Sequence, residues 1–154
     1  LQHVGDPVTA LREMRRVAVP GGIVAARDAD YAGFLCFPEL PELDRWLTLY
    51  RAAARANGGE PDAGRRLLSW ARAAGFTDIT ATASTWCYAS PAERAWWGGM
   101  WADRVLQSRF AEDALGRGFA TREELEAISR AWTAWAEHPD GWLAMPHGEL
   151  LAQA

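Results

Sequence analysis

Hydrophobic residues recur at threefold spacing near the start of the chain, at Val8, Leu11, Met14 and Val17. Charged residues fill most of the positions between them, so one face of a helix is apolar and the other polar. Asp6 and Pro7 suit an N-cap and a first helical residue. Pro20 and the two glycines that follow it end the helix and turn the chain. The pattern predicts a helix over about residues 7–17.

The next segment, Ile23–Ala26, is apolar without alternation. A strand covered on both faces, as in a parallel sheet flanked by helices, has this pattern. The pattern along the rest of the chain first predicts a helix over 43–54, a helix that follows Pro61 and ends at Gly75, and a strand over 77–88. Two more helices are predicted to begin at capping boxes, at Ser90 and Thr121. The last predicted element is a short strand over 142–145, which Pro146 interrupts.

Residues 1–31 combine Leu1-Gln2-His3, Asp6-Pro7, a Pro-Gly-Gly turn and the strand after it. This arrangement resembles the second half of class I S-adenosylmethionine-dependent methyltransferases of the small-molecule type. The resemblance continues more weakly through AAGF at 73–76 and GWLAMPHGELLA at 141–152. It implies an α/β fold: the C-terminal part of a doubly wound, Rossmann-like sheet, with a helical insertion before the last strand.

The resemblance implies one partial methyltransferase domain over 1–154, with a helical insertion or lid over 90–138. Such folds hold the cofactor mainly at a glycine-rich turn after the first strand, and this sequence contains no such turn. The nearest pattern, at 116–118, follows a predicted helix and is interpreted as a helix terminus. We therefore expect a truncation, a proteolytic product or half of a split protein, which is inactive by itself.

Two groups of residues are the first candidates for the site. The resemblance implies that Leu1, Gln2 and His3 contact S-adenosylmethionine; His3 is also a candidate proton acceptor, or it only packs near the first helix. The second group, Arg27, Asp28, Asp30 and Tyr31, follows the buried strand, at the end where open α/β sheets bind ligands.

In this second group, Asp28 is the candidate general base. Arg27, Asp30 and Tyr31 are candidates for binding the acceptor. The alternative is a solvated loop or an ion pair of Arg27.

Tryptophan is the compositional outlier, with nine residues in 154. Trp97 and Trp101 lie one helical turn apart and either pack between helices or cover a flat acceptor while excluding water. His147, near Glu149 in the last segment, is a further candidate for binding substrate, with a structural role as the alternative.

The remaining composition narrows the classes of function. The net charge is −4, with no long basic run for nucleic acid and no run of about 20 apolar residues for a membrane, so a soluble, cytoplasmic protein is expected. Cys36 and Cys87 are expected to be buried free thiols, and no spacing of residues predicts a metal site. No nucleophile elbow or HExxH motif is present, which favours catalysis by positioning.

The first hypothesis is that the intact protein transfers a methyl group from S-adenosylmethionine to a small-molecule acceptor. The alternative is a non-catalytic module that binds a ligand or partner through its tryptophan-rich helical face. Under either hypothesis an exposed sheet edge favours a homodimer.

Overall fold

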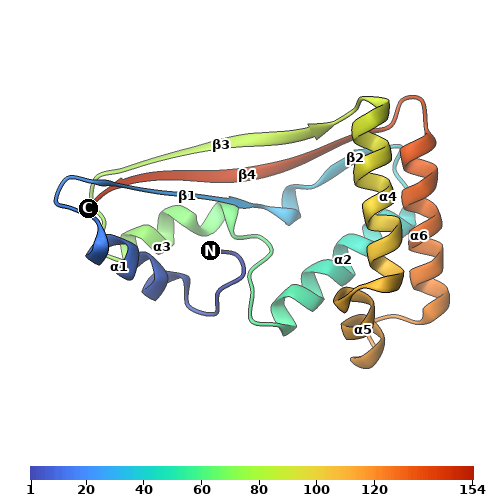
Figure 1. Cartoon of the computed structure of the whole chain (residues 1–154), viewed down its shortest axis with the longest axis horizontal. Coiled ribbons are helices and arrows are strands. Elements are labelled where there is room, and N and C mark those ends of the chain that lie inside the picture. Colours follow the sequence, from blue (N-terminus) through green and yellow to red (C-terminus); the bar gives the residue numbers. More distant parts are fainter. The chain divides into compact units, whose positions relative to one another are not determined.

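The computed structural model describes all 154 residues and divides them into two units, drawn together in Figure 1. The sheet unit comprises Leu1–Phe34, Asn57–Trp86 and Met145–Ala154. The helical unit comprises Leu35–Ala56 and Cys87–Ala144.

The elements of the sheet unit follow the predicted order. They are α1 (Pro7–Val17), β1 (Ile23–Ala29), the short helix η1 (Tyr31–Gly33), the short helix η2 (Gly64–Arg66), α3 (Leu67–Ala73), and most of β3 (Ile79–Tyr88) and β4 (Trp142–Gln153). The predicted cap of α1 is confirmed, because an Asp6 side-chain oxygen accepts from the Thr9 N–H at 2.9 Å.

The sheet is antiparallel around β4. β1 pairs with β4 from Ile23 opposite Gln153 to Ala29 opposite His147. β3 also pairs with β4. Its direction follows from two contacts, since Asp78 O accepts from Gln153 N, whereas Ser84, further along β3, bonds Glu149, earlier in β4. The α/β character is confirmed, and the pairing recorded here is antiparallel.

One face of this sheet carries the core of the sheet unit. α1 and α3 lie on that side of the strands in Figure 1, and their apolar residues pack against Val24, Leu150 and Ala152. On the opposite face Ile23 and Leu151 are 64% and 51% exposed. The prediction that β1 is covered on both faces is therefore wrong for this chain, because both helices that contact the strands lie on one side.

The prediction that Pro146 interrupts the last strand is also wrong, since β4 runs without a break through it. The Pro146 carbonyl accepts a hydrogen bond from Asp30 N at 2.9 Å. The register with β1 ends at His147, and the register with the short strand β2 (Leu35–Phe37) begins at Ala144. Pro146 thus lies where neither strand requires the N–H that proline lacks.

The helical unit packs four helices: α2 (Pro41–Ala56), α4 (Pro91–Gln107), α5 (Arg109–Gly116) and α6 (Arg122–Glu137). α4 lies along α6, as Figure 1 also shows, and α2 contacts α5 and α6. Both predicted capping boxes, at Ser90 and Thr121, are confirmed. α5 was not predicted, and its C-terminal end contains the 116–118 glycines, so these do form a helix terminus.

Five buried tryptophans form the core of the helical unit, here called the tryptophan cluster: Trp46, Trp97, Trp101, Trp132 and Trp135. The Trp46 ring meets those of Trp101 and Trp132 edge-on at 4.7 and 4.8 Å. Trp135 Nε1 donates to Phe37 O at 3.1 Å, which ties α6 to β2. No helix in the structure is both long enough and apolar enough to span a membrane.

Candidate functional site

The carboxyl end of β1 places two aspartates in buried positions. Asp28 is 7% exposed and Asp30 is 6% exposed. Charged carboxylates are rarely buried this deeply unless other groups compensate their charge. The groups that surround these two aspartates therefore define the candidate site.

Asp28 contacts the first residues of the chain. Its Oδ1 accepts hydrogen bonds from Leu1 N at 3.1 Å and from Gln2 N at 3.2 Å. Its Oδ2 is buried and has no hydrogen-bond partner, and the same holds for Oε1 of Gln2. The structure thus brings Leu1, Gln2 and Asp28 together and leaves two buried acceptor oxygens without donors.

His3 joins this group through Gln2. Gln2 Nε2 lies 2.8 Å from His3 Nε2. Because an amide nitrogen only donates, His3 Nε2 accepts, and a neutral His3 then carries its proton on Nδ1. In this arrangement the free ring nitrogen of His3 is a hydrogen-bond donor, so His3 would need a different arrangement to abstract a proton.

Asp30 is held by a residue that the sequence analysis missed, Arg65. Asp30 Oδ2 accepts from Arg65 N at 3.0 Å and from Nε at 2.6 Å, and Oδ1 accepts from Nη2 at 2.7 Å. Tyr31 is 8% exposed, and its N–H donates to Pro61 O at 3.1 Å. Neither aspartate lies in a solvated loop. The substrate-binding roles of Asp30 and Tyr31 stay predictions.

A cavity of about 510 Å³ lies beside Asp30 and Arg65. Its other walls are Gly33, Gly64, Thr82, Ala83, Pro146, His147 and Gly148. Gly64 also lies against Asp28, since a Cβ built on Gly64 would be 2.9 Å from Asp28 O. The cavity therefore adjoins the segment that carries both aspartates.

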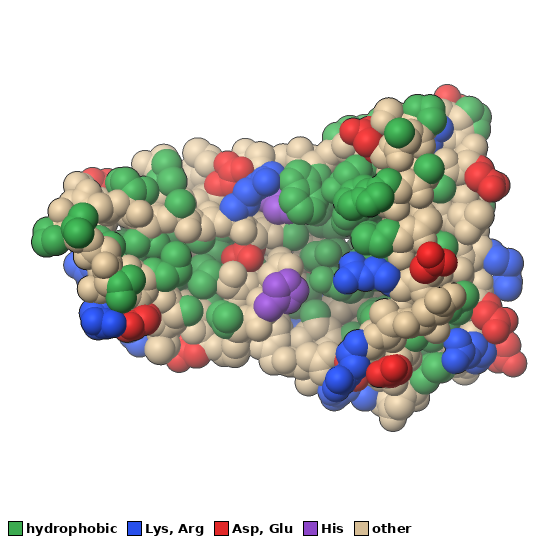
Figure 2. All heavy atoms as spheres, viewed as in Figure 1, with side chains coloured by type: hydrophobic (Ala, Val, Ile, Leu, Met, Phe, Trp, Pro, Cys, Tyr) green, Lys and Arg blue, Asp and Glu red, His purple; other side chains and the backbone are tan.

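Arg27 and His147 belong to a second polar group, over β3 and β4. Arg27 pairs with Glu149 at 3.1 Å, and its guanidinium lies 5.4 Å from the Trp86 ring centre. The Trp86 ring centre is in turn 4.1 Å from that of His147. Figure 2 shows basic, acidic, histidine and hydrophobic side chains meeting over these strands. The predicted ion pair of Arg27 is present, with Glu149 as its partner.

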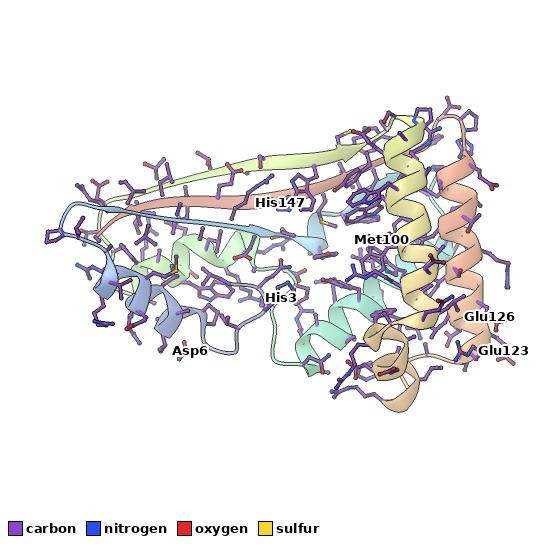
Figure 3. The ribbon with its side chains drawn as sticks, in the orientation of Figure 1. His3, Asp6, Met100, Glu123, Glu126 and His147 are labelled. Atoms are coloured by element: carbon purple, nitrogen blue, oxygen red, sulfur yellow. The ribbon has the colours of Figure 1, made fainter.

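The side chain of His147 is buried, and its surroundings favour the uncharged imidazole. Its Nδ1 lies 3.0 Å from Met145 O, and because a carbonyl only accepts, Nδ1 carries the proton and Nε2 is left as an acceptor. Burial lowers the pKa of His147 below its ordinary value, and nearby Arg27 lowers it further. In Figure 3 His147 lies at β4, whereas His3 lies on the α3 side of β1, so the two histidines are not brought together.

The predicted aromatic residues of the helical unit are packed. Trp101 is 3% exposed and contacts Trp46, Trp132 and the ring of Phe110. The ring of Trp97, 6% exposed, stacks on Tyr88 at 4.6 Å. These contacts are those of helix packing. The indole N–H groups of Trp97 and Trp101 have no acceptor, and a role in covering substrate stays a prediction.

No group of three or more His, Cys, Asp or Glu side chains is arranged to hold a metal ion. Both cysteines are free; Cys36 is partly buried, and burial raises the pKa of its thiol to about 11. The prediction of a buried thiol is wrong for Cys87, which is exposed because β3 leaves most of its residues uncovered.

The proteins that match this sequence are named as methyltransferases. The chain is 35% identical over 158 residues to the uncharacterized methyltransferase C1B3.06c of Schizosaccharomyces pombe, covering 98% of this chain and 54% of that protein. It is 31% identical over 159 residues to the probable methyltransferase ltbC of Aspergillus luteorubrus, covering 95% and 53%. The chain spans about half the length of these curated relatives. No protein-family profile matches it. The similarities support a methyltransferase.

Proposed function

We propose that the intact protein transfers a methyl group from S-adenosylmethionine to a small-molecule acceptor in the cytoplasm, with no nucleic-acid or membrane partner. The observation that carries the proposal is the contact between Gln2 N and Asp28 Oδ1 at 3.2 Å. It joins the segment that the resemblance assigns to the cofactor with the residue assigned to the acceptor. The names of both relatives agree with methyl transfer.

The strand arrangement supports a position within a larger sheet. β4 pairs with both β1 and β3 and runs antiparallel to them. Asp28 then lies at the carboxyl end of β1, the end at which open α/β sheets bind ligands. We propose that the three strands belong to a doubly wound sheet whose remaining strands lie in the other half of the protein.

The residues of this chain fit part of a cofactor site. Oε1 of Gln2 is a buried acceptor without a donor, and S-adenosylmethionine offers N–H and O–H donors. Gln2 would hold one of these donors, with Leu1 and His3 beside it. When bound, the cofactor supplies a methyl group on a positively charged sulfur. This chain would then supply only part of the cofactor site, and we expect it to be inactive alone.

Asp28 would act on the acceptor molecule. An O–H or N–H group of the acceptor would donate to Oδ2, which has no partner in this chain. As the acceptor atom takes the methyl carbon and the carbon–sulfur bond breaks, the acceptor's proton would pass to this carboxylate and the sulfur would keep the bonding electron pair, leaving S-adenosylhomocysteine. Arg27, Asp30, Tyr31 and His147 stay proposed acceptor contacts, and Trp97 and Trp101 are proposed to keep water out.

One observation favours the alternative, a binding module without catalysis. Trp96 is 59% exposed, and its ring centre lies 5.8 Å from that of Trp97 and 5.9 Å from that of Tyr88. An exposed aromatic surface of this kind suits a ligand or a partner protein. A homodimer through the free edge of β1, which pairs only with β4 here, fits either function.

The test uses the full-length protein to which this chain is proposed to belong. S-adenosylhomocysteine formation is measured with panels of phenols, amines and acids as acceptors, for the parent and for Asp28→Asn. We expect turnover with at least one panel and a loss of about a hundredfold or more in Asp28→Asn, because the proton acceptor is removed. Asp103→Asn, on the exposed face of α4, is the matched control and should keep full activity.

Two outcomes would contradict the proposal. Absence of turnover, together with absence of cofactor binding, would favour the binding module. Full activity of Asp28→Asn would show that Asp28 does not accept the proton and that the carboxyl end of β1 does not have the role proposed here.

A further inference from the structure

The cavity of about 510 Å³ in the sheet unit has the size of a small-molecule site. Three of its wall residues, Gly33, Gly64 and Gly148, present only backbone, while Ala83 and Pro146 add small apolar surfaces. The cavity therefore suits a compact molecule with an apolar body. Its charged lining residues are Asp30 and Arg65.

Asp30 fixes the guanidinium of Arg65 at this cavity. Three hydrogen bonds of 2.6–3.0 Å, from the backbone N, Nε and Nη2 of Arg65, end on the two oxygens of Asp30. Asp30 itself is 6% exposed and so cannot move aside easily, whereas the Arg65 side chain is 56% exposed. A guanidinium held in this way loses little further freedom when it binds a ligand.

One side of the guanidinium remains available. Asp30 occupies the edge formed by Nε and Nη2, and Nη1 makes no hydrogen bond. Nη1 and the second proton of Nη2 form another two-pronged edge, and that geometry matches the two oxygens of a carboxylate. The charges of Asp30 and Arg65 compensate each other, so the two charged residues that line the cavity together carry no net charge.

We propose that this cavity binds a small carboxylic acid, with the carboxylate on the free edge of Arg65 and the apolar body against the glycine and proline walls. Arg65 is then a specificity-determining residue and Asp30 its positioning residue. Binding of the acid does not depend on the activity proposed above. That the bound acid is the methyl acceptor does rest on it, and Gly64, which lies against both Asp28 and the cavity, makes the two sites neighbours.

The neighbouring arginine offers a matched control. Arg66 directly follows Arg65, is similarly exposed at 50%, and pairs with Glu60 at 3.1 Å, but it does not line the cavity. Arg66→Gln removes the same charge from the same short helix. Any nonspecific effect of charge on anion binding would therefore appear equally in the Arg65 and Arg66 variants.

Benzoate is the probe, titrated into the 154-residue chain and followed by backbone amide NMR shifts, with inorganic phosphate as the competing anion. We expect saturable shifts at Gly33, Gly64 and Gly148, with a dissociation constant on the order of millimolar. Arg65→Gln should weaken binding about ten- to a hundredfold, as loss of a charge-assisted hydrogen bond does. Arg66→Gln should bind like the parent.

Arg65→Lys keeps the proposal testable if Arg65→Gln unfolds, because it retains the charge and loses only the two-pronged edge. We expect it to weaken benzoate binding about tenfold. Unchanged benzoate binding in Arg65→Lys or Arg65→Gln would overturn the proposal, as would tighter binding of phosphate than of benzoate. Benzoate binding by a protein without methyltransferase activity would refute only the acceptor role, since carboxylate recognition would remain.

Discussion

The two units of this chain bury different kinds of side chain. Near the end of β1 the sheet unit buries three aspartates, Asp28, Asp30 and Asp62, each less than 8% exposed. The helical unit buries the tryptophan cluster, whose members are 0–6% exposed. Aromatic burial stabilises a fold directly, whereas a buried carboxylate costs free energy unless donors surround it. We therefore expect the chemistry in the sheet unit, whereas the helical unit is built mainly by packing.

The largest expected effect comes from the tryptophan cluster. Trp132 is fully buried against Trp46, Trp101 and Trp135. Trp132→Ala should lower the free energy of unfolding by about 3–5 kcal/mol, because it removes apolar contact and leaves a cavity. Urea denaturation measures the loss. Trp96→Ala, at an exposed ring, should change stability by less than about 0.5 kcal/mol; equal losses in the two variants would contradict the assigned packing.

The corresponding change in the sheet unit is Asp30→Asn. The asparagine amide keeps the shape of the side chain but lacks the negative charge of the carboxylate, whose two oxygens accept three hydrogen bonds from Arg65. We expect a loss of about 1.5–3 kcal/mol, measured by the same denaturation. Asp78→Asn is the control, at an exposed position next to β3, and should cost less than about 0.5 kcal/mol. A neutral result for Asp30→Asn would mean that the Arg65 pair does not stabilise this unit.

Packing against α6 distinguishes two adjacent glycines of α4. A Cβ at Gly98 would lie 2.7 Å from the Ala136 Cβ and 2.9 Å from Trp132 O, whereas a Cβ at Gly99 would meet nothing within 4 Å. Gly98→Ala should therefore destabilise by about 1–3 kcal/mol. Gly99→Ala should stabilise by about 0.5–1 kcal/mol through helix propensity. Thermal unfolding of both variants checks the sign, and the same sign in both would contradict the α4–α6 contact.

The smallest expected effect is the pH dependence from His147. Its pKa is lowered in the folded chain, so between that pKa and the ordinary value the unfolded chain binds more protons. Stability contributed by neutral His147 is therefore present above about pH 7 and is lost as the pH falls through the lowered pKa. Urea denaturation at a series of pH values should show a flatter profile for His147→Asn; an identical profile would exclude His147 as the cause.

Local signals predicted much of the fold. The caps at Asp6, Ser90 and Thr121 each depend on residues within three positions, and all three are present. α5 was missed because Ser108 both ends α4 and caps α5, with no glycine or proline to mark the boundary. The break expected at Pro146 is absent because the missing N–H of proline matters only where a neighbouring strand would pair with it, and strand pairing cannot be read from the local sequence.

The candidate site was predicted only where it depends on nearby residues. The carboxyl end of β1 was located from the strand pattern, and the structure buries Asp28 and Asp30 there; their roles stay predictions. Arg65, however, lies 35 residues from Asp30, and Glu149 lies 122 residues from Arg27, so no local pattern connects these pairs. Such contacts follow from the way η2 packs against β1 and β4 pairs with it, which is a tertiary property.

The most direct test of the account is calorimetric titration of S-adenosylhomocysteine into two proteins, the full-length protein to which this chain is proposed to belong and the 154-residue chain alone. The account predicts saturable binding by the full-length protein and no saturable binding by the chain up to millimolar ligand, because only Leu1, Gln2 and His3 of this chain are proposed to contact the cofactor. Absence of binding by the full-length protein would contradict the central claim that this chain is part of an S-adenosylmethionine-dependent methyltransferase.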